Sequence, residues 1–168
     1  MKRNWMVLLS GSAICLAAWG VTVYAQAKSD DRAEIKALED RLVKAVNARD
    51  IDAVMAVYVP DESLFVFDVI PPRQYVGAKA YRDDWKGFLD GPVSYESSDL
   101  AVEIDGNLAF GHKIFHAAGT DASGNKYDFT ARVTDVYRKI NGKWLIVQEH
   151  VSVPVDVATG KADLASKP

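Results

Sequence analysis

The sequence predicts an α+β fold in which a curved, cone-shaped antiparallel sheet packs against three N-terminal helices, in the order α-α-β-α-β-β-β. Two runs rich in β-branched and aromatic residues flank Asn141-Gly142, a dipeptide typical of tight hairpins. Helical periodicity of apolar residues is confined to the chain before residue 90. No helical segment separates the later strands, which excludes a parallel, doubly wound sheet. Long antiparallel strands curl, and helices on one side of the curl leave a cone with an open mouth.

The N-terminus is predicted to be a secretory signal peptide over residues 1–27. Lys2 and Arg3 precede the apolar run Trp5–Ala18, and small residues at cleavage spacing end near Ala25 or Ala27. The protein is then exported to the periplasm or medium and leaves the membrane after cleavage. The alternative is an uncleaved membrane anchor, because the uncharged stretch is long enough to span a bilayer.

The first helix is predicted over Asp30–Ala48. Its apolar side includes Leu42, and Glu39 is assigned to the charged opposite side. Asp30 or Asp31 is expected to cap it, because a carboxylate suits the positive end of the helix dipole.

Two shorter helices are predicted further along the chain. Asp50 is expected to cap a helix over Ile51–Tyr58. A third helix is predicted over Ala78–Leu89, with Tyr81 and Trp85 on its apolar side. All three helices are amphipathic, so we expect their apolar sides to pack against one face of the sheet.

Strands are predicted at Ser63–Val69, Val93–Ile104 and Leu108–Ala118, and the long hairpin Lys126–Val153 completes the sheet. The remaining residues, 155–168, are small and polar and are expected to form a flexible tail. Residues 28–154 are therefore predicted to form one domain.

Composition and motifs exclude several classes of function. The chain of 168 residues carries a net charge of −3 and no basic block, so we expect no nucleic-acid partner. It contains no Gly-rich phosphate loop, nucleophile elbow or zinc motif, so no cofactor is expected. His112 and His116 would share one face of a strand, but two histidines alone are a weak metal signal. We interpret them as surface residues and expect no metal site.

Three stretches carry a resemblance to a known superfamily: Arg49-Asp50-Ile51-Asp52-Ala53, the segment Arg138–Trp144, and Glu149-His150-Val151-Ser152-Val153-Pro154. Together with the order of elements, they resemble the nuclear transport factor 2-like superfamily, and most of all its SnoaL-like, ketosteroid-isomerase-like branch. The same ending is similar to the association domain of calcium/calmodulin-dependent kinase II. This superfold hosts enzymes, binding proteins and assembly modules, so the resemblance specifies fold better than function.

The resemblance implies two catalytic carboxyl groups. Asp68 matches the proton-shuttling base at the end of a strand, and an apolar cleft would raise its pKa toward a useful range. The alternative is that Asp68 faces solvent at the strand end. Asp135 matches an acid that stays neutral and donates a hydrogen bond to an oxyanion. The alternative is an ion pair between Asp135 and a neighbouring strand.

The third group of the isomerases, a tyrosine in the first helix, is missing, since Leu42 stands at about that position. Tyr58 is the candidate replacement, and the alternative is that it belongs to the core, as a tyrosine at a helix end more often does. The pocket is predicted to be lined by Tyr58, Tyr81, Trp85, Val133, Tyr137, Glu149 and Val151.

The outer face of the sheet is predicted to hold a structural network and a homodimer contact. A three-residue loop at Ile140-Asn141-Gly142 would pair Arg132 with His150, whereas a two-residue turn would place His150 beside Val133. Trp144 is assigned to the same outer face, together with Val136 and Ile146, and so much apolar surface predicts a dimer.

Three functions fit these features. The first is a lyase or isomerase that performs acid–base chemistry on a small apolar molecule with a carbonyl group. The second is a non-catalytic carrier or sensor of such a molecule. The third is a dimeric assembly module. The side chains that line the cone discriminate among them.

Overall fold

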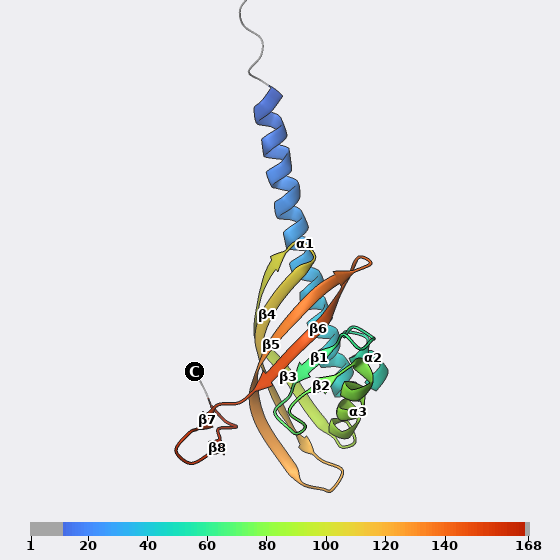
Figure 1. Cartoon of the computed structure of the whole chain (residues 1–168), viewed down its shortest axis with the longest axis vertical. Helices are drawn as coiled ribbons and strands as arrows, with labels where there is room; N and C mark the ends of the chain where they lie inside the picture. Colours follow the sequence, from blue (N-terminus) through green and yellow to red (C-terminus); the bar gives the residue numbers. More distant parts are fainter. Residues whose placement is uncertain (1–11, 167–168) are drawn as a thin grey trace, which may run out of the picture.

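The computed structural model describes residues 12–166, with side chains from residue 29 onward. Figure 1 shows long strands curving around a long helix, with two short helices beside the shortest strands. The helices are α1 (Ser12–Ala48), α2 (Ile51–Met55) and α3 (Ala78–Phe88). The strands are β1 (Phe65–Phe67), β2 (Tyr75–Val76), β3 (Val93–Asp105), β4 (Leu108–Thr120), β5 (Lys126–Ile140), β6 (Lys143–Ser152), β7 (Val155–Asp156) and β8 (Lys161–Ala162).

The main sheet has six strands in the order β2-β1-β6-β5-β4-β3. Every neighbouring pair is antiparallel except β1 and β6, which are parallel. The parallel pair arises because α3 and three long strands separate β1 from β6 along the chain. The predicted α+β architecture, with helices on the inner face of a curved and mostly antiparallel sheet, is confirmed.

Helix α1 buries one side against β3 and β6. It begins before the predicted start, so neither Asp30 nor Asp31 caps it. Asp31 instead pairs with Lys139 and accepts a hydrogen bond from Trp144 Nε1 at 3.0 Å. Glu39 is only 3% exposed, so its assignment to the charged side was wrong. Within residues 12–166, no helix is long and apolar enough to cross a membrane.

The cap of α2 is confirmed, because Asp50 Oδ1 accepts from the backbone N–H groups of Asp52 and Ala53 at 3.1 and 3.0 Å. The helix nevertheless ends at Met55, before the predicted Tyr58. The chain leaves the helix there because Val57 and Val59 form backbone hydrogen bonds with Ile146 of β6. Pairing with the sheet therefore replaces the last helical turn.

The β5–β6 hairpin has a two-residue turn, with positive φ angles at Asn141 (50°) and Gly142 (78°). A register shift follows between Val136 and Tyr137, where β6 carries one extra residue, Val147. His150 therefore pairs with Thr134, and Arg132 pairs with Ser152. Both predicted pairings of His150 were wrong, since each assumed a ladder without a bulge.

The predicted outer apolar surface was wrong for two of its three residues. Trp144 and Ile146 are buried in the core on the inner side, and only Val136 is half-buried. The two-residue turn causes this reversal, because it pairs Trp144 with Lys139 and Ile146 with Tyr137, one position away from the register of a three-residue loop. Arg132, Thr134 and His150 are exposed on the outer face, as expected.

The C-terminal segment forms a small hairpin of β7 and β8. Two backbone hydrogen bonds hold the segment, from Thr130 N to Leu164 O and from Asp163 N to Pro154 O, each of 2.8 Å. Flexibility of this segment stays a prediction, but its conformation is ordered into strands rather than irregular.

Candidate active site

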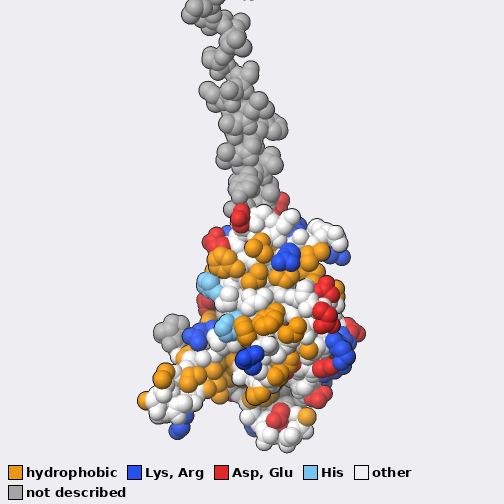
Figure 2. Space-filling view, in the orientation of Figure 1, with side chains coloured by type: hydrophobic (Ala, Val, Ile, Leu, Met, Phe, Trp, Pro, Cys, Tyr) orange, Lys and Arg blue, Asp and Glu red, His pale blue; other side chains and the backbone are white. Residues whose placement is uncertain are grey.

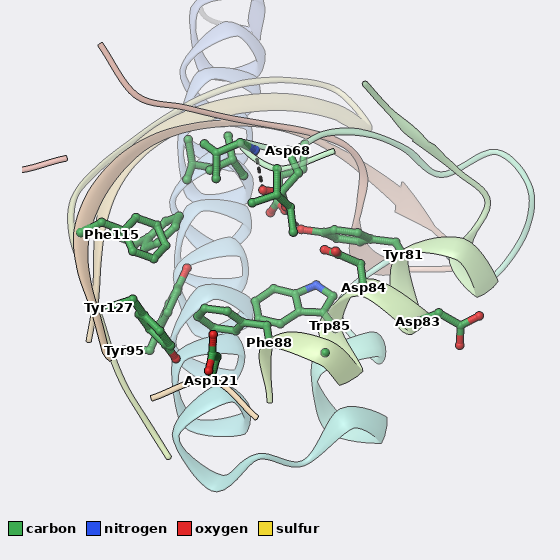
Figure 3. Close-up of a pocket in the computed structure, with 17 residues that line it drawn as sticks. Asp68, Tyr81, Asp83, Asp84, Trp85, Phe88, Tyr95, Phe115, Asp121 and Tyr127 are labelled. Carbon is green, nitrogen blue, oxygen red and sulfur yellow. Dashed lines mark hydrogen bonds between the residues drawn. The ribbon is translucent and has the colours of Figure 1, made fainter. Parts of the chain in front are cut away.

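A cavity of about 500 Å³ lies between α3 and the concave face of β3–β6 (Figure 3). Its volume is in the range of small-molecule sites, which is about 300–1,000 Å³. Side chains from the loop after β1, from α3 and from the four long strands reach it. The lining residues are Asp68, Val69, Ile70, Tyr81, Asp83, Asp84, Trp85, Gly87, Phe88, Tyr95, Phe115, Asp121, Tyr127, Phe129, Val133, Glu149 and Val151.

Seven aromatic rings form a continuous series of contacts around this cavity, which we call the aromatic arc. Neighbouring ring centroids lie between 5.0 and 6.1 Å apart, and three of the six contacts are edge-to-face. Asn47 of α1 fixes one end, because its side chain forms hydrogen bonds with both backbone groups of Tyr95, at 2.8 and 2.9 Å. The arc consists of Tyr81, Trp85, Phe88, Tyr127, Phe129, Phe115 and Tyr95.

Five of the seven predicted pocket residues line the cavity, and two do not. Tyr81, Trp85, Val133, Glu149 and Val151 are lining residues. The other two, Tyr58 and Tyr137, are fully buried behind the cavity wall, where their hydroxyl groups bind carboxyl groups.

Asp68 lies just after β1 and lines the cavity in a half-buried position. Its Oδ1 atom accepts a hydrogen bond from the N–H of Val69 at 2.5 Å, drawn in Figure 3. Burial, reinforced by the negative charge of Asp84, raises the pKa of Asp68 to about 6. Asp84 itself accepts a hydrogen bond from the Tyr75 hydroxyl at 2.7 Å. Of the two interpretations of Asp68, this position agrees with the pocket rather than with free solvent.

Glu149 reaches the cavity from β6 and is almost fully buried. The hydroxyl groups of Tyr58 and Tyr81 both donate hydrogen bonds to it, the first at 3.1 Å. Burial raises the pKa of Glu149, while Lys113 and the Tyr81 hydroxyl act in the opposite direction. Sequence reasoning assigned Glu149 to the pocket lining but did not assign it a catalytic role.

Asp135 lies directly opposite Glu149 in the β5–β6 ladder, but it is not among the lining residues of the cavity. Its Oδ2 atom pairs with Lys113 Nζ at 2.9 Å, which agrees with the ion-pair interpretation. Burial raises the pKa of Asp135 to about 7, against the attraction of Lys113. Its Oδ1 atom has no donor partner among the residues that the structure describes. A proton shared with Glu149 would satisfy that atom.

Lys113 and Glu39 complete a buried network that sequence reasoning missed. Lys113 is 2% exposed and pairs with Glu39 as well as with Asp135. The Tyr137 hydroxyl donates to Glu39 at 2.8 Å. A signal was present for both residues. Lys113 lies two residues before Phe115 and therefore shares the buried face of β4, and Glu39 fits the helical spacing of the buried face of α1.

The histidines lie away from the cavity. His112 is exposed, and His116 Nε2 is 2.8 Å from Asp128 Oδ1 at the surface. In the part of the chain covered by the structure, no three His, Cys, Asp or Glu side chains are grouped so that they could hold a metal ion.

Sequence comparison agrees with this architecture. The SnoaL-like domain model matches residues 35–156. The chain belongs to the SnoaL-like domain family. This match includes every helix and strand that builds the cavity except the first part of α1. No match was found among curated proteins.

Solved structures support the same superfamily. An NTF2-like protein of unknown function from Pseudomonas putida KT2440 is 33% identical, covers 83% of this chain and 98% of its own, and has a TM-score of 0.73. A putative calcium/calmodulin dependent protein kinase II association domain from Xanthomonas campestris is 26% identical, with coverage of 74% and 88% and a TM-score of 0.63. A putative scytalone dehydratase from Novosphingobium aromaticivorans shares the fold at 14% identity, with coverage of 86% and 99% and a TM-score of 0.69.

Leu42 occupies the position matched to the missing tyrosine, and it is a buried core residue of this SnoaL-like domain. Two other tyrosines, Tyr58 and Tyr81, converge on Glu149. The acidic end of the cavity is therefore built around Glu149, whereas the resemblance pointed to Asp135.

Proposed function

We propose that this protein is an acid–base enzyme, an isomerase or lyase, that acts on a small and largely apolar molecule with a carbonyl group. The observation that carries the proposal is that two carboxyl groups in unlike environments face one aromatic cavity. Asp68 is half-buried, whereas Glu149 is buried and bound by two tyrosine hydroxyls. Different environments give two carboxyl groups different pKa values, so that one can act as a base while the other acts as an acid.

Asp68 is the base. With a pKa of about 6 it is mostly ionised at neutral pH, yet it is more basic than a free aspartate. It takes the proton from the carbon next to the carbonyl group, and the electron pair moves onto the carbonyl oxygen. Return of the proton to another carbon completes an isomerisation, and loss of a leaving group from the next carbon completes an elimination.

Glu149 delivers the compensating proton to the carbonyl oxygen. Three buried carboxyl groups lie close to one ammonium group: Lys113 pairs with Glu39 and Asp135, and Glu149 lies opposite Asp135 in the ladder. Three ionised acids in a dry site repel each other, so at least one of them keeps a proton at neutral pH. The cross-strand neighbours Asp135 and Glu149 share that proton, and only Glu149 faces the ligand.

The experiment is exchange of α-protons for deuterium in D2O, followed by NMR across a panel of cyclic aryl ketones. This readout detects proton abstraction without knowledge of the natural product. Asp68→Asn should lower the exchange rate by at least about a hundredfold, the low end for loss of a general base. Asp128→Asn is the control, because Asp128 is exposed and outside the cavity. Equal exchange in wild type and Asp68→Asn would refute the assignment of the base.

A non-catalytic carrier is the second candidate. It is favoured by the position of Asp135, since one of the two carboxyl groups expected in the cavity is not among its lining residues. Ligand binding without α-proton exchange for any ketone of the panel would establish the carrier in place of the enzyme.

Export and dimerisation are further proposals. Asp31 of α1, which lies beyond both predicted cleavage points, contacts Lys139 of β5 and Trp144 of β6. Cleavage near Ala25 or Ala27 would therefore keep all the side chains of α1 that are described as buried, from Ile35 onward. The residues before 12, including the basic start and the first half of the apolar run, lie outside the described part of the chain.

The proposed dimer uses the outer face of the sheet. Phe110 is 53% exposed there, and Leu108 and Phe67 are also exposed. Figure 2 shows hydrophobic side chains beside histidine side chains on the visible face. Phe67 packs on the ring of His150 with centroids 5.5 Å apart. An assembly module would use the same face, and the open cavity would then have a separate role.

A further inference from the structure

The side chains that line the cavity carry one sign of charge. Five of the lining residues are acidic, and none of the lining residues is lysine, arginine or histidine. The nearest described buried cation, Lys113, lies outside the lining and is already paired with Glu39 and Asp135. A ligand that enters this cavity therefore meets carboxyl groups and no positive partner.

Not all five acidic residues contribute equally. Asp83 pairs with Lys79 and Lys86 at 3.0 Å and is turned away from the cavity in Figure 3, so its charge is neutralised. Asp121 accepts hydrogen bonds within its own turn, which lower its pKa and keep it ionised. Asp68 and Asp84 lie on the same side of the cavity.

The aromatic arc provides a second attraction for positive charge. An aromatic ring carries negative charge density on its faces, and a cation within about 6 Å of a face is attracted to it. Edge-to-face contacts turn neighbouring rings by large angles, 63° between Tyr81 and Trp85 and 78° between Trp85 and Phe88. Rings at such angles do not form one flat surface, so the wall that they build is faceted. The arc therefore offers ring faces to the cavity from more than one side.

Two hydrogen-bond donors in the arc have no partner among the residues that the structure describes. Trp85 Nε1 and the Tyr127 hydroxyl are buried atoms without a hydrogen bond. Trp85 is only 8% exposed, and in Figure 3 its nitrogen lies on the edge turned toward Tyr81 and Asp84. A buried donor without a partner is costly, and both residues line the cavity. A bound oxygen atom would satisfy either donor.

We propose that the cavity binds an organic cation: a small amine or quaternary ammonium group on an aromatic or alicyclic frame that also carries an oxygen acceptor. The ammonium group lies against the aromatic arc and near Asp68 and Asp84, and the oxygen accepts from Trp85 or Tyr127. The inference rests on the proposed function in one respect, since the oxygen is taken to be the carbonyl of the reacting molecule. Aromatic acids are excluded as ligands because their carboxylates would face only like charges.

The test compares three probes of nearly equal shape by calorimetry or by quenching of tryptophan fluorescence. Phenacyltrimethylammonium is the cation, neopentyl phenyl ketone replaces its nitrogen by carbon, and 3-benzoylpropanoate is the anion. The cation should bind at least about tenfold more tightly than the neutral ketone, and the anion more weakly than either. Added salt should weaken binding of the cation alone.

Variants test which side chains cause the tighter binding of the cation. The double variant Asp68→Asn/Asp84→Asn should lose most of the preference for the cation and keep its affinity for the neutral ketone. Asp128→Asn should keep the full preference, because its side chain lies outside the cavity. Circular dichroism of each variant checks the fold.

The outcomes separate this inference from the proposed function. Equal binding of cation and neutral ketone, tighter binding of the anion, or no binding of any probe at millimolar concentration would overturn the inference. Cation-selective binding without proton exchange would support it while removing the enzyme. Proton exchange on neutral ketones with no preference for the cation would overturn the inference while supporting the enzyme.

Discussion

Asp135 and Glu149 occupy directly opposed positions on β5 and β6, and both are almost completely buried. Two ionised carboxyl groups in such positions would repel each other strongly in the low dielectric of the core. Lys113, at 2.9 Å from Asp135, compensates only part of this charge because it also pairs with Glu39. We therefore infer that the pair holds a proton at neutral pH, which is the basis of the acid role proposed for Glu149.

The first prediction concerns the stability of this network. Lys113→Met should lower the free energy of unfolding by about 3–5 kcal/mol, because it leaves Glu39 and Asp135 buried without their cation. Urea unfolding at pH 7 measures the effect. Lys36→Met is the matched control, since Lys36 forms an exposed pair with Asp40 and should change stability by less than about 0.5 kcal/mol. A loss in Lys113→Met no larger than in the control would show that the network is dispensable.

The second prediction concerns the pH dependence of stability. The pKa of Asp135 is raised to about 7 in the folded protein, so folding takes up a proton between about pH 4 and 7. The stability from this group is present at low pH and decreases as pH rises toward 7. Glu39 and Glu149 have raised pKa values and act with the same sign.

Urea unfolding at pH 5, 6 and 7 should therefore give a smaller pH-dependent loss in Asp135→Asn than in wild type. Between pH 5 and 7, wild type should lose about 1.4–3 kcal/mol more unfolding free energy than Asp135→Asn, because each unit of pKa shift corresponds to about 1.4 kcal/mol. Identical slopes in the two proteins would mean that Asp135 is ionised in the fold.

The third prediction concerns export. Protein recovered from the periplasm or medium of its native host should begin near Gln26 or Lys28, because both proposed cleavage points precede the buried part of α1. Intact-mass spectrometry measures the start. An uncut chain recovered only from the membrane fraction would contradict cleavage and favour the anchor.

The fourth prediction concerns the outer face of the sheet. The mature protein should be a dimer at micromolar concentration in light scattering, and Phe110→Lys should shift it toward the monomer. Val157→Lys is the control, because Val157 is exposed but lies in the C-terminal hairpin. A monomeric wild type would remove the proposed dimer.

The fold was predictable because its signals are local. The Asn141-Gly142 turn, the Asp50 cap and the apolar periodicity each depend on a few neighbouring residues. The bulge at Val147 was not predictable, since the hairpin sequence contains no residue that requires it. That bulge moved His150 from the position beside Val133, which a two-residue turn alone would give, to the position beside Thr134.

The site was predicted only in part. Asp68 was identified through the family resemblance, which implies a base at the end of this strand. Glu149 lines the cavity and Asp135 does not, whereas the resemblance implied the catalytic role for Asp135. Access to the cavity depends on how β5, β6 and α3 pack, and this packing cannot be predicted from local sequence. Lys113 was missed because charged residues are rarely buried. Its position on the buried face of its strand was therefore not taken as a sign of burial.

The pH dependence of α-proton exchange tests the central claim most directly, that Asp68 is the base of this cavity. In wild type, the rate on the most reactive ketone of the panel should rise with pH to a plateau, with a midpoint of about 6. The groups that face Asp68 are Asp84 and Tyr81 of α3, Tyr75 of β2 and Glu149 of β6.

Asp84→Asn should shift the midpoint to lower pH, because the charge of Asp84 raises the pKa of Asp68. Asp68→Asn should remove the rise and leave only a low rate. A rise near pH 6 that persists in Asp68→Asn would contradict the account, because the base would then be a different group.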